Sequence, residues 1–240
     1  MIKAIIFDVD GTLAETEDGH RMAFNKAFEQ EELPWHWDQS LYRDLLAVTG
    51  GKERIRHFVE TYKPKGGDAV DDEWIKALHA IKTGHYTALV AEGRLSLRPG
   101  VRSIMEQARA KGLRLAISTT TTPANVTALI GSTIGESGLS WFDVIGAGDV
   151  VPAKKPAPDI YQYVLAQLNL GPEEALAIED SEAGLKSARA AGIPSVVTES
   201  IYTNGGDFDG AAAVLPHLPD NLDDLLSLAG VKSPAGVGGA

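Results

Sequence analysis

Short apolar runs alternate with helical patterns along most of the chain. IKAIIFDV (2–9) is short, continuous and β-branched, which is typical of a strand buried on both faces. Similar runs cover 113–118, 142–147, 174–180 and 193–198, with a weaker one at 212–216. Between them, apolar residues recur at helical spacing, as at Val101, Ile104, Met105 and Ala108. This alternation of strands and helices predicts an α/β fold with a parallel sheet.

One long stretch departs from this alternation. Residues 15–92 contain four helical patterns and no convincing strand, with the patterns at about 17–31, 38–48, 51–62 and 71–90. We therefore predict a Rossmann-like parallel core (1–14 and 93–230) with a helical cap domain (15–92) inserted after the first strand. The Gly/Pro/Ala-rich residues 231–240 are predicted to form a disordered tail.

Charge and composition exclude several kinds of binding partner and several kinds of site chemistry. The formal net charge of −11 argues against nucleic acid, whose affinity comes mainly from Lys and Arg on phosphates. A local cluster of cations could still bind a small phosphate. The absence of cysteine excludes disulfides, thiolate catalysis and zinc–thiolate sites. No apolar stretch is long enough for a membrane span or resembles a secretory leader, so we expect a cytoplasmic protein, by default a monomer.

Polar residues follow several of the predicted strands. Ligands in open parallel sheets bind at the carboxyl ends of the strands. The polar residues found there are Asp8 and Asp10, Ser118 and Thr119, Lys154 and Lys155, and Glu179 and Asp180. Any one of them alone is most simply a helix cap or a turn residue, but their combination at strand ends is hard to reach by chance.

The acids among these residues predict a metal site. Asp8 and Asp10 repel each other if they lie close, and a hard cation such as Mg²⁺, which takes oxygen ligands, relieves that repulsion. Asp180 from a neighbouring strand can complete the cluster, and Lys155 can neutralise a bound anion. Such a site suits phosphoryl transfer, where positioning and charge neutralisation do most of the catalysis.

Four motifs in order resemble the haloacid dehalogenase superfamily of phosphohydrolases. They are FDVDGTL, AISTT, KKPAPDIY and AIEDSEAGLKSARAAG. The resemblance covers the predicted core, and the helical insertion is similar to the small helical cap of that family. An acid at position 10 favours phosphate esters over carbon–halogen bonds, because an alkoxide leaving group needs a proton and a halide does not.

The resemblance implies a role for each motif residue. Asp8 is the nucleophile that forms an aspartyl-phosphate, and Asp10 protonates the leaving oxygen and later activates water. Mg²⁺ is held by the Asp8 carboxylate, the Asp10 backbone carbonyl and Asp180, with support from Glu179. The transferring phosphoryl group is held by Ser118, the backbone amide of Thr119, and Lys155.

The insertion supplies candidate substrate contacts. Gly50 and Gly51 precede a helix whose first amides can bind an anion, and Lys52 and Arg54 lie beside them. The remaining candidates are Glu17, His20, Tyr42 and Arg43. Glu17 could accept hydrogen bonds from sugar hydroxyls, and the cations could form a second phosphate site. The basic residues could equally form a solvated helix face, and His20 could be a packing residue.

The cap is most similar to that of the CbbY type. That resemblance implies a sugar-phosphate phosphatase selective for xylulose-1,5-bisphosphate, an inhibitor of Rubisco. A β-phosphoglucomutase or a phosphoglycolate phosphatase would use the same core motifs, and Thr16 and His20 would also suit a mutase. A non-enzymatic phosphate-sensing module remains a distant alternative, against which the cap and Asp10 both speak.

Overall fold

Six parallel strands form a single sheet at the centre of the molecule. The computed structural model describes residues 1–67, 70–93 and 95–232. The strand order is β3-β2-β1-β4-β5-β6, with every neighbouring pair parallel. The strands are Ala4–Phe7 (β1), Arg114–Ser118 (β2), Val144–Gly146 (β3), Ala175–Glu179 (β4), Ser195–Thr198 (β5) and Ala213–Leu215 (β6). All six predicted strands are present, and the predicted fold class is confirmed.

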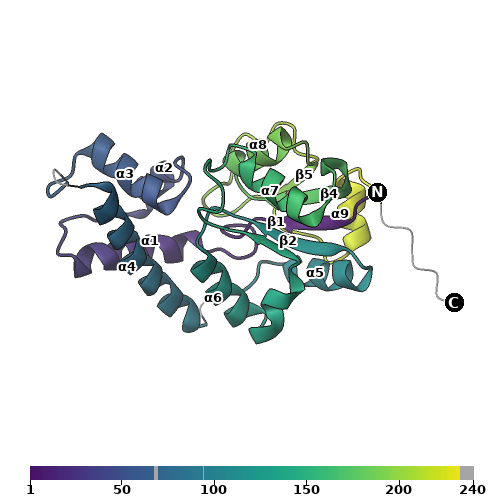
Figure 1. The fold of residues 1–240 in the computed structure, drawn as a ribbon, viewed down its shortest axis with the longest axis horizontal. Helices are drawn as coiled ribbons and strands as arrows, with labels where there is room; N and C mark the ends of the chain where they lie inside the picture. The colour runs from purple at the N-terminus through teal and green to yellow at the C-terminus, as the bar shows by residue number, and fades with distance from the viewer. Residues whose placement is uncertain (68–69, 94, 233–240) are drawn as a thin grey trace.

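Helices cover both faces of this sheet (Figure 1). Alternate residues of β1 point to opposite faces. Ile5 and Phe7 pack in a cluster with α5, α6 and α9, whereas Ala4 and Ile6 pack with α7 and α8. These helices are Val101–Ala110 (α5), Pro123–Thr133 (α6), Asp159–Leu168 (α7), Glu182–Ala190 (α8) and Leu222–Leu228 (α9). The sheet is therefore buried on both sides, as its continuous apolar strands predict.

Four helices between β1 and α5 form a separate bundle, at the left of Figure 1. They are Glu17–Gln30 (α1), Gln39–Leu45 (α2), Gly51–Tyr62 (α3) and Asp72–Ala91 (α4). Aromatic side chains build much of the bundle's own core, including Phe24, Phe28, Trp37 and Phe58. All four predicted helices are present. The predicted domain boundaries at residues 15 and 92 stay a prediction.

The chain enters and leaves the bundle at one place. Ala14 and Leu97 form an antiparallel bridge, and the Arg98 backbone N–H donates to the Leu13 carbonyl at 2.8 Å. The two connections between bundle and core thus run side by side.

The C-terminal end of the described chain is packed rather than free. Val231 packs against the core, and the Ile2 N–H donates to the Lys232 carbonyl at 3.3 Å. The predicted disordered tail, residues 231–240, stays a prediction. The rest of the predicted tail, residues 233–240, lies outside the described residues.

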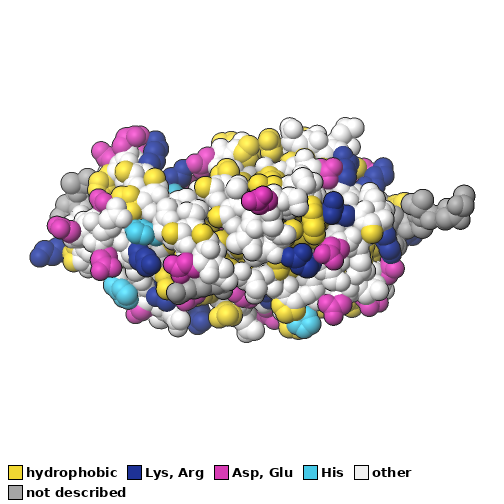
Figure 2. Space-filling view, turned by 90° about the horizontal axis from the view of Figure 1, so that it is seen from below, with side chains coloured by type: hydrophobic (Ala, Val, Ile, Leu, Met, Phe, Trp, Pro, Cys, Tyr) yellow, Lys and Arg dark blue, Asp and Glu magenta, His cyan; other side chains and the backbone are white. Residues whose placement is uncertain are grey.

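The surface shows no segregation of charge on the face drawn in Figure 2. Lys and Arg side chains are interspersed there with Asp and Glu instead of gathering into one basic patch. Within the described ranges, none of the helices combines the length and the apolar character that crossing a bilayer requires.

Candidate active site

Asp8 lies at the carboxyl edge of the sheet, directly after β1. Its N–H donates to the Ile178 carbonyl at 3.0 Å, which continues the β1–β4 ladder by one residue. Because β1 lies between β2 and β4, the same register places Ser118 on one side of Asp8 and Glu179 on the other. The Thr12 hydroxyl donates to Asp8 Oδ2 at 3.4 Å. Three motifs distant in sequence therefore meet at one rung of the sheet.

Lys155 is the cation of this rung. Its Nζ donates to Asp8 Oδ1 at 2.8 Å, to Glu179 Oε1 at 2.6 Å and to the Ser118 carbonyl at 2.8 Å. Burial alone would lower the pKa of Lys155, but the charges of Asp8 and Glu179 outweigh burial and raise it. Lys155 is therefore a permanent positive charge beside Asp8. Its neighbour Lys154 instead pairs with Asp149 at 2.5 Å.

Asp8, Glu179 and Asp180 form a buried acidic cluster. One carboxylate oxygen of each lies within 4.8 Å of the others. Burial raises the pKa of Asp8 to about 7, with Lys155 opposing and Glu179 adding to the effect. Burial, followed by the charge of Asp8, raises the pKa of Asp180 well above its ordinary value. A divalent cation would relieve this unfavourable crowding of acids.

The donor set of this cluster fits Mg²⁺. All three side chains offer the hard carboxylate oxygens that this ion prefers. The second oxygen of Glu179, Oε2, is buried and accepts no hydrogen bond from the described part of the chain. A Cβ on Gly184 would fall 1.9 Å from that oxygen, so the cation site is indicated by the convergence of the three carboxylates and not by this atom.

Asp10 begins a hydrogen-bonded chain that runs into the bundle. Its Oδ1 accepts from the Thr16 hydroxyl at 2.6 Å and lies 2.9 Å from His20 Nε2. The other ring nitrogen of His20, Nδ1, lies 2.7 Å from Lys82 Nζ on α4. The His20 ring also stacks on Tyr86, with centroids 3.8 Å apart.

Burial and charge shift the pKa values along this chain. Burial, with the nearby charge of Lys82, lowers the pKa of His20. Burial lowers the pKa of Lys82 to about 7, although Asp10 partly offsets it. Burial would raise the pKa of Asp10, but the charge and hydrogen bond of His20 outweigh it and hold that pKa below its ordinary value. A carboxylate, an imidazole and an amine thus lie in consecutive hydrogen-bond contact.

The prediction for Ser118 and Thr119 needs correction. The Thr119 backbone amide, predicted to hold a phosphoryl oxygen, donates to the Gly146 carbonyl at 2.9 Å and so belongs to the sheet ladder. The Ser118 side chain is fully buried and does not line the cavity, whereas Thr119 lines it. In this structure the Thr119 side chain, and not its backbone amide or the Ser118 side chain, is therefore available to a ligand in the cavity.

A polar network connects the bundle side of the site. Glu17 Oε2 accepts from the Tyr42 hydroxyl at 2.8 Å, and Arg54 Nη1 donates to that hydroxyl at 2.9 Å. Arg54 Nε also donates to the Leu45 carbonyl at 3.2 Å. Tyr42 therefore supports Glu17 and Arg54 from behind, and does not itself line the cavity.

A cavity of about 570 Å³ lies between the acidic cluster and the bundle. Most of the predicted site residues line it, namely Asp8, Asp10, Glu17, His20, Arg43, Gly51, Arg54, Thr119, Lys155 and Asp180. The loop after β5 closes part of the wall through Tyr202, Thr203 and Asn204. The cavity is large enough for a small phosphorylated metabolite.

Lys52 lies elsewhere than predicted. It is absent from the cavity wall, and its Nζ forms an ion pair with Asp149 in the loop after β3. Since α3 belongs to the bundle and Asp149 to the core, Lys52 links the two units instead of lining the cavity.

Two titratable side chains on α4 are among the cavity residues that the sequence reasoning missed. Lys82 and His79, one turn apart on α4, both line the cavity. Lys82 had a recognisable signal, because it interrupts the apolar stripe of Leu78 and Tyr86 at i, i+4 spacing. A lysine at a core position needs a partner, and such a position is a candidate for function.

The fold and the acidic strand ends define a class of hydrolase. A family model described as haloacid dehalogenase-like hydrolase matches residues 2–192, so the chain belongs to that family. Its relatives include the protein CbbY of Rhodobacter capsulatus, which is 51% identical over 217 residues, covering 90% of this chain and 94% of the relative. The prediction of a hydrolase of this superfamily, with likeness to CbbY, is confirmed.

Two solved structures share both the fold and much of the sequence. Crystal structures of CbbY from Rhodobacter sphaeroides, one in complex with phosphate and one of a mutant in complex with xylulose-(1,5)bisphosphate, superpose with a TM-score of 0.86. They are 46% and 45% identical to this chain, and each match covers 90% of this chain and 95% of the other. The family and these relatives together support an enzyme of the phosphatase class.

Proposed function

We propose that this enzyme is a Mg²⁺-dependent phosphatase that removes one phosphate from a sugar bisphosphate, with xylulose-1,5-bisphosphate as its preferred substrate. The observation that carries the proposal is the two-sided cavity. One wall holds Asp8 with its cation Lys155, and the facing wall holds Arg43 and Arg54. A substrate with a phosphate at each end fits two cationic walls, and a CbbY relative has been crystallised with such a molecule.

In the first chemical step, an Asp8 carboxylate oxygen attacks phosphorus. The bond between phosphorus and the sugar oxygen breaks, and its electron pair leaves with that oxygen. Lys155, held on Asp8 Oδ1, offsets the negative charge that nucleophile and phosphate bring together. Thr12 on Oδ2 helps to fix the orientation of the carboxylate. The product of this step is an aspartyl-phosphate on Asp8.

Asp10 handles the proton of both steps. It gives a proton to the departing sugar oxygen, then takes one from the water that hydrolyses the aspartyl-phosphate. To act first as an acid, Asp10 has to carry a proton, and His20 Nε2 at 2.9 Å is placed to share one with it. The other ring nitrogen of His20, Nδ1, lies 2.7 Å from Lys82 Nζ, so His20 can also exchange a proton with the Lys82 amine.

Asp8, Asp180 and Glu179 are the side chains that would hold Mg²⁺, together with the Asp10 backbone carbonyl. When bound, the ion supplies positive charge that stabilises the transferring phosphoryl group. The chain itself supplies a dry setting, since Asp8, Asp180 and Glu179 are all buried. Burial strengthens each electrostatic contact to the reacting group and limits access of other nucleophiles.

The bundle side selects the substrate in this proposal. Arg43 and Arg54 bind the phosphate that is not cleaved, near the first turn of α3 at Gly51. Glu17, supported by Tyr42, accepts hydrogen bonds from sugar hydroxyls. The proposed specificity therefore lies in the inserted helices, and the nucleophile and metal ligands lie at the sheet.

Phosphate release by the purified enzyme tests this proposal. Xylulose-1,5-bisphosphate, ribulose-1,5-bisphosphate, phosphoglycolate and β-glucose-1-phosphate are compared with Mg²⁺, with excess chelator, and with Asp8→Asn. We expect strong release from the xylulose bisphosphate, lost in the last two conditions. Preferential release from phosphoglycolate would overturn the second phosphate site, and isomerisation of the glucose phosphate without release would indicate a mutase. No turnover of any of the four would contradict the phosphatase assignment.

A further inference from the structure

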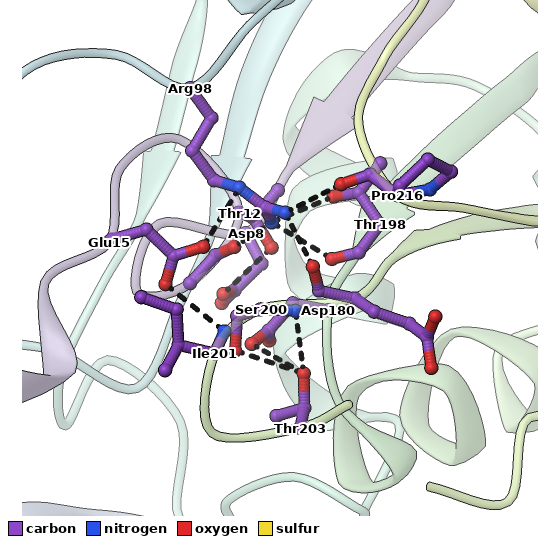
Figure 3. Close-up of polar contacts among 12 residues, drawn as sticks. Asp8, Thr12, Glu15, Arg98, Asp180, Thr198, Ser200, Ile201, Thr203 and Pro216 are labelled. Atoms are coloured by element: carbon purple, nitrogen blue, oxygen red, sulfur yellow. Dashed lines mark hydrogen bonds and ion pairs between the residues drawn. The ribbon is translucent and has the colours of Figure 1, made fainter. Parts of the chain in front are cut away.

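Arg98 is a buried cation outside the site described above. Its side chain is 8% exposed, and its Nε pairs with Glu15 Oε1 at 3.1 Å. Its Nη1 donates to the carbonyl of Thr198 at 2.9 Å and to that of Gly11. Its Nη2 donates to the carbonyls of Glu199, at 2.5 Å, and Pro216, at 3.0 Å. One guanidinium thus joins the turn after Asp10, the end of β5 and the end of β6 (Figure 3).

Two of the backbone segments held by Arg98 enclose Asp180. Gly11 lies so close to that carboxylate that a Cβ on Gly11 would fall 2.1 Å from Asp180 Oδ2. The same Cβ would fall 3.2 Å from Cβ of Ser200, which is on the other segment. With a backbone φ of +79° as well, position 11 accepts only glycine without strain. The Asp180 carboxylate therefore lies in a narrow slot between the Gly11 turn and the loop after β5.

Hydrogen bonds fix the loop side of this slot. The Thr203 hydroxyl lies 3.4 Å from Asp180 Oδ2 and 2.9 Å from the Ser200 hydroxyl. Glu15 extends the hold of Arg98 on the loop, because its Oε2 accepts from the Ile201 N–H at 3.4 Å. Figure 3 shows these contacts around Asp180.

We propose that Arg98, with Glu15, is a positioning pair for the metal centre: it holds the Gly11 turn and the loop 199–203 together so that Asp180 keeps the geometry of a metal ligand. This inference rests on the proposed function, which makes Asp180 a ligand. Arg98 does not line the active-site cavity and has no hydrogen bond or ion pair with the acids of the metal cluster, so it acts only through the two segments it joins. Groups that orient metal ligands typically affect metal affinity by 10- to 100-fold when they are removed.

Arginine suits this task better than lysine does. Its planar fork presents five donors in fixed directions, whereas an ammonium group is a point charge on a flexible stem. An Arg98→Lys variant keeps the charge and loses the simultaneous grip on the separate segments. An apolar replacement would leave several buried carbonyls unsatisfied and would endanger folding, so it is a poor test.

The experiment compares Mn²⁺ binding, measured by electron paramagnetic resonance on metal-free protein, in the wild type, Arg98→Lys and Glu15→Gln. The matched control is Glu174→Gln. Like Glu15, Glu174 pairs with a cation, Lys3, and accepts a backbone N–H, from Gly171, but it lies directly before β4, at the opposite end of that strand from Asp180. Hydrogen exchange of residues 198–204 is measured on the same proteins without metal.

We expect Arg98→Lys to bind Mn²⁺ at least tenfold more weakly than the wild type. Its backbone hydrogens in residues 198–204 should exchange faster. Glu15→Gln should show a smaller change in the same direction, and Glu174→Gln no change in either measurement. A folded Arg98→Lys protein with unchanged Mn²⁺ affinity would overturn the proposal. If that variant does not fold, unchanged affinity in Glu15→Gln decides against it. Failure of the proposed function would appear differently, as a wild type that binds no Mn²⁺.

Discussion

At the residue scale, the molecule is organised around buried charges, each with a specific partner. Lys155 and Asp8 were foreseeable, because both belong to short motifs whose chemistry is legible in the sequence. The contacts of Lys82 and Arg98 were not, because their partners come from distant segments that no motif connects to them, although the apolar stripe marks Lys82 as a core position. Periodicity identifies a residue as buried, but the acceptor that makes its burial tolerable depends on tertiary structure.

The role of Asp8 as nucleophile and that of Asp10 as general acid–base can be distinguished with an activated substrate. In Asp10→Asn, steady-state hydrolysis of a sugar phosphate should fall by about 10²- to 10⁴-fold, the usual worth of a general acid–base group. With p-nitrophenyl phosphate, whose leaving group needs no proton, a burst of nitrophenolate equal to the enzyme concentration should persist. Stopped-flow absorbance measures the burst, and its absence would contradict the assignment of Asp10 to proton transfer.

Lys82 makes stability depend on pH in a defined direction. Its pKa falls from 10.5 in the unfolded chain to about 7 in the folded protein, mainly through burial. Between these values the unfolded chain binds the extra proton, so wild-type stability gains with rising pH, by at most about 1.4 kcal/mol per pH unit from this group. The free energy of unfolding of wild type minus that of Lys82→Met should therefore increase from pH 7 to pH 10.

Urea unfolding at several pH values measures this difference. The control is Lys76→Met, which removes an exposed lysine from the same helix. A pH-independent difference for Lys82→Met would mean that Lys82 stays charged in the folded protein.

At the element scale, the strands were easier to predict than two of the helices. Each strand is an isolated apolar run, whereas α6 and α9 were not predicted. Helix α6 has a good start, with Thr122 as N-cap and Pro123 following, but its body is rich in Thr, Val, Ile and Gly, which are modest helix formers. Helix α9 has only seven residues, too few for a clear period. Packing against the sheet stabilises both helices.

Helices α2 and α3 provide a test of substrate selection. Arg43 on α2 lines the cavity, whereas Arg56 on α3 pairs with Asp72 on α4 at 2.6 Å and does not line it. Arg43→Gln should raise KM for the bisphosphate about tenfold, equivalent to about 1.4 kcal/mol of binding energy, with kcat unchanged. KM for p-nitrophenyl phosphate should stay the same. Steady-state kinetics measures both KM values, with Arg56→Gln as control. An equal rise in KM for the two substrates would contradict the second phosphate site.

At the scale of the whole molecule, contacts on different elements hold the bundle over the cavity. The Lys52–Asp149 pair joins α3 to the loop after β3. The Tyr202 hydroxyl donates to Asp18 Oδ1 on α1 at 2.8 Å, and its ring packs edge-on against Tyr42. These partners are distant in sequence, which is why the sequence pattern predicted Lys52 as a substrate contact and not as a link between bundle and core.

A double-mutant cycle on Lys52 and Asp149 distinguishes the two roles. If Lys52 acts through Asp149, then Lys52→Met, Asp149→Asn and the double variant should lose similar amounts of kcat/KM, about three- to tenfold, because the second change removes nothing further. Lys111→Met, which removes an ion pair that lies within the core, serves as control. Additive losses, or a loss confined to Lys52→Met, would return Lys52 to a direct role with substrate.

The adjacent connections at Leu13 and Arg98 have a consequence for how such enzymes diversify. Seen from the sheet, the whole bundle is one long hairpin loop whose ends are already hydrogen-bonded. Loop-closure entropy grows slowly, by about 0.6 kcal/mol per doubling of length. The insert can therefore be shortened, enlarged or exchanged at small cost to the core. Substrate range is in this sense heritable separately from the nucleophile and the metal ligands, the first carried by an interchangeable module and the others by its host.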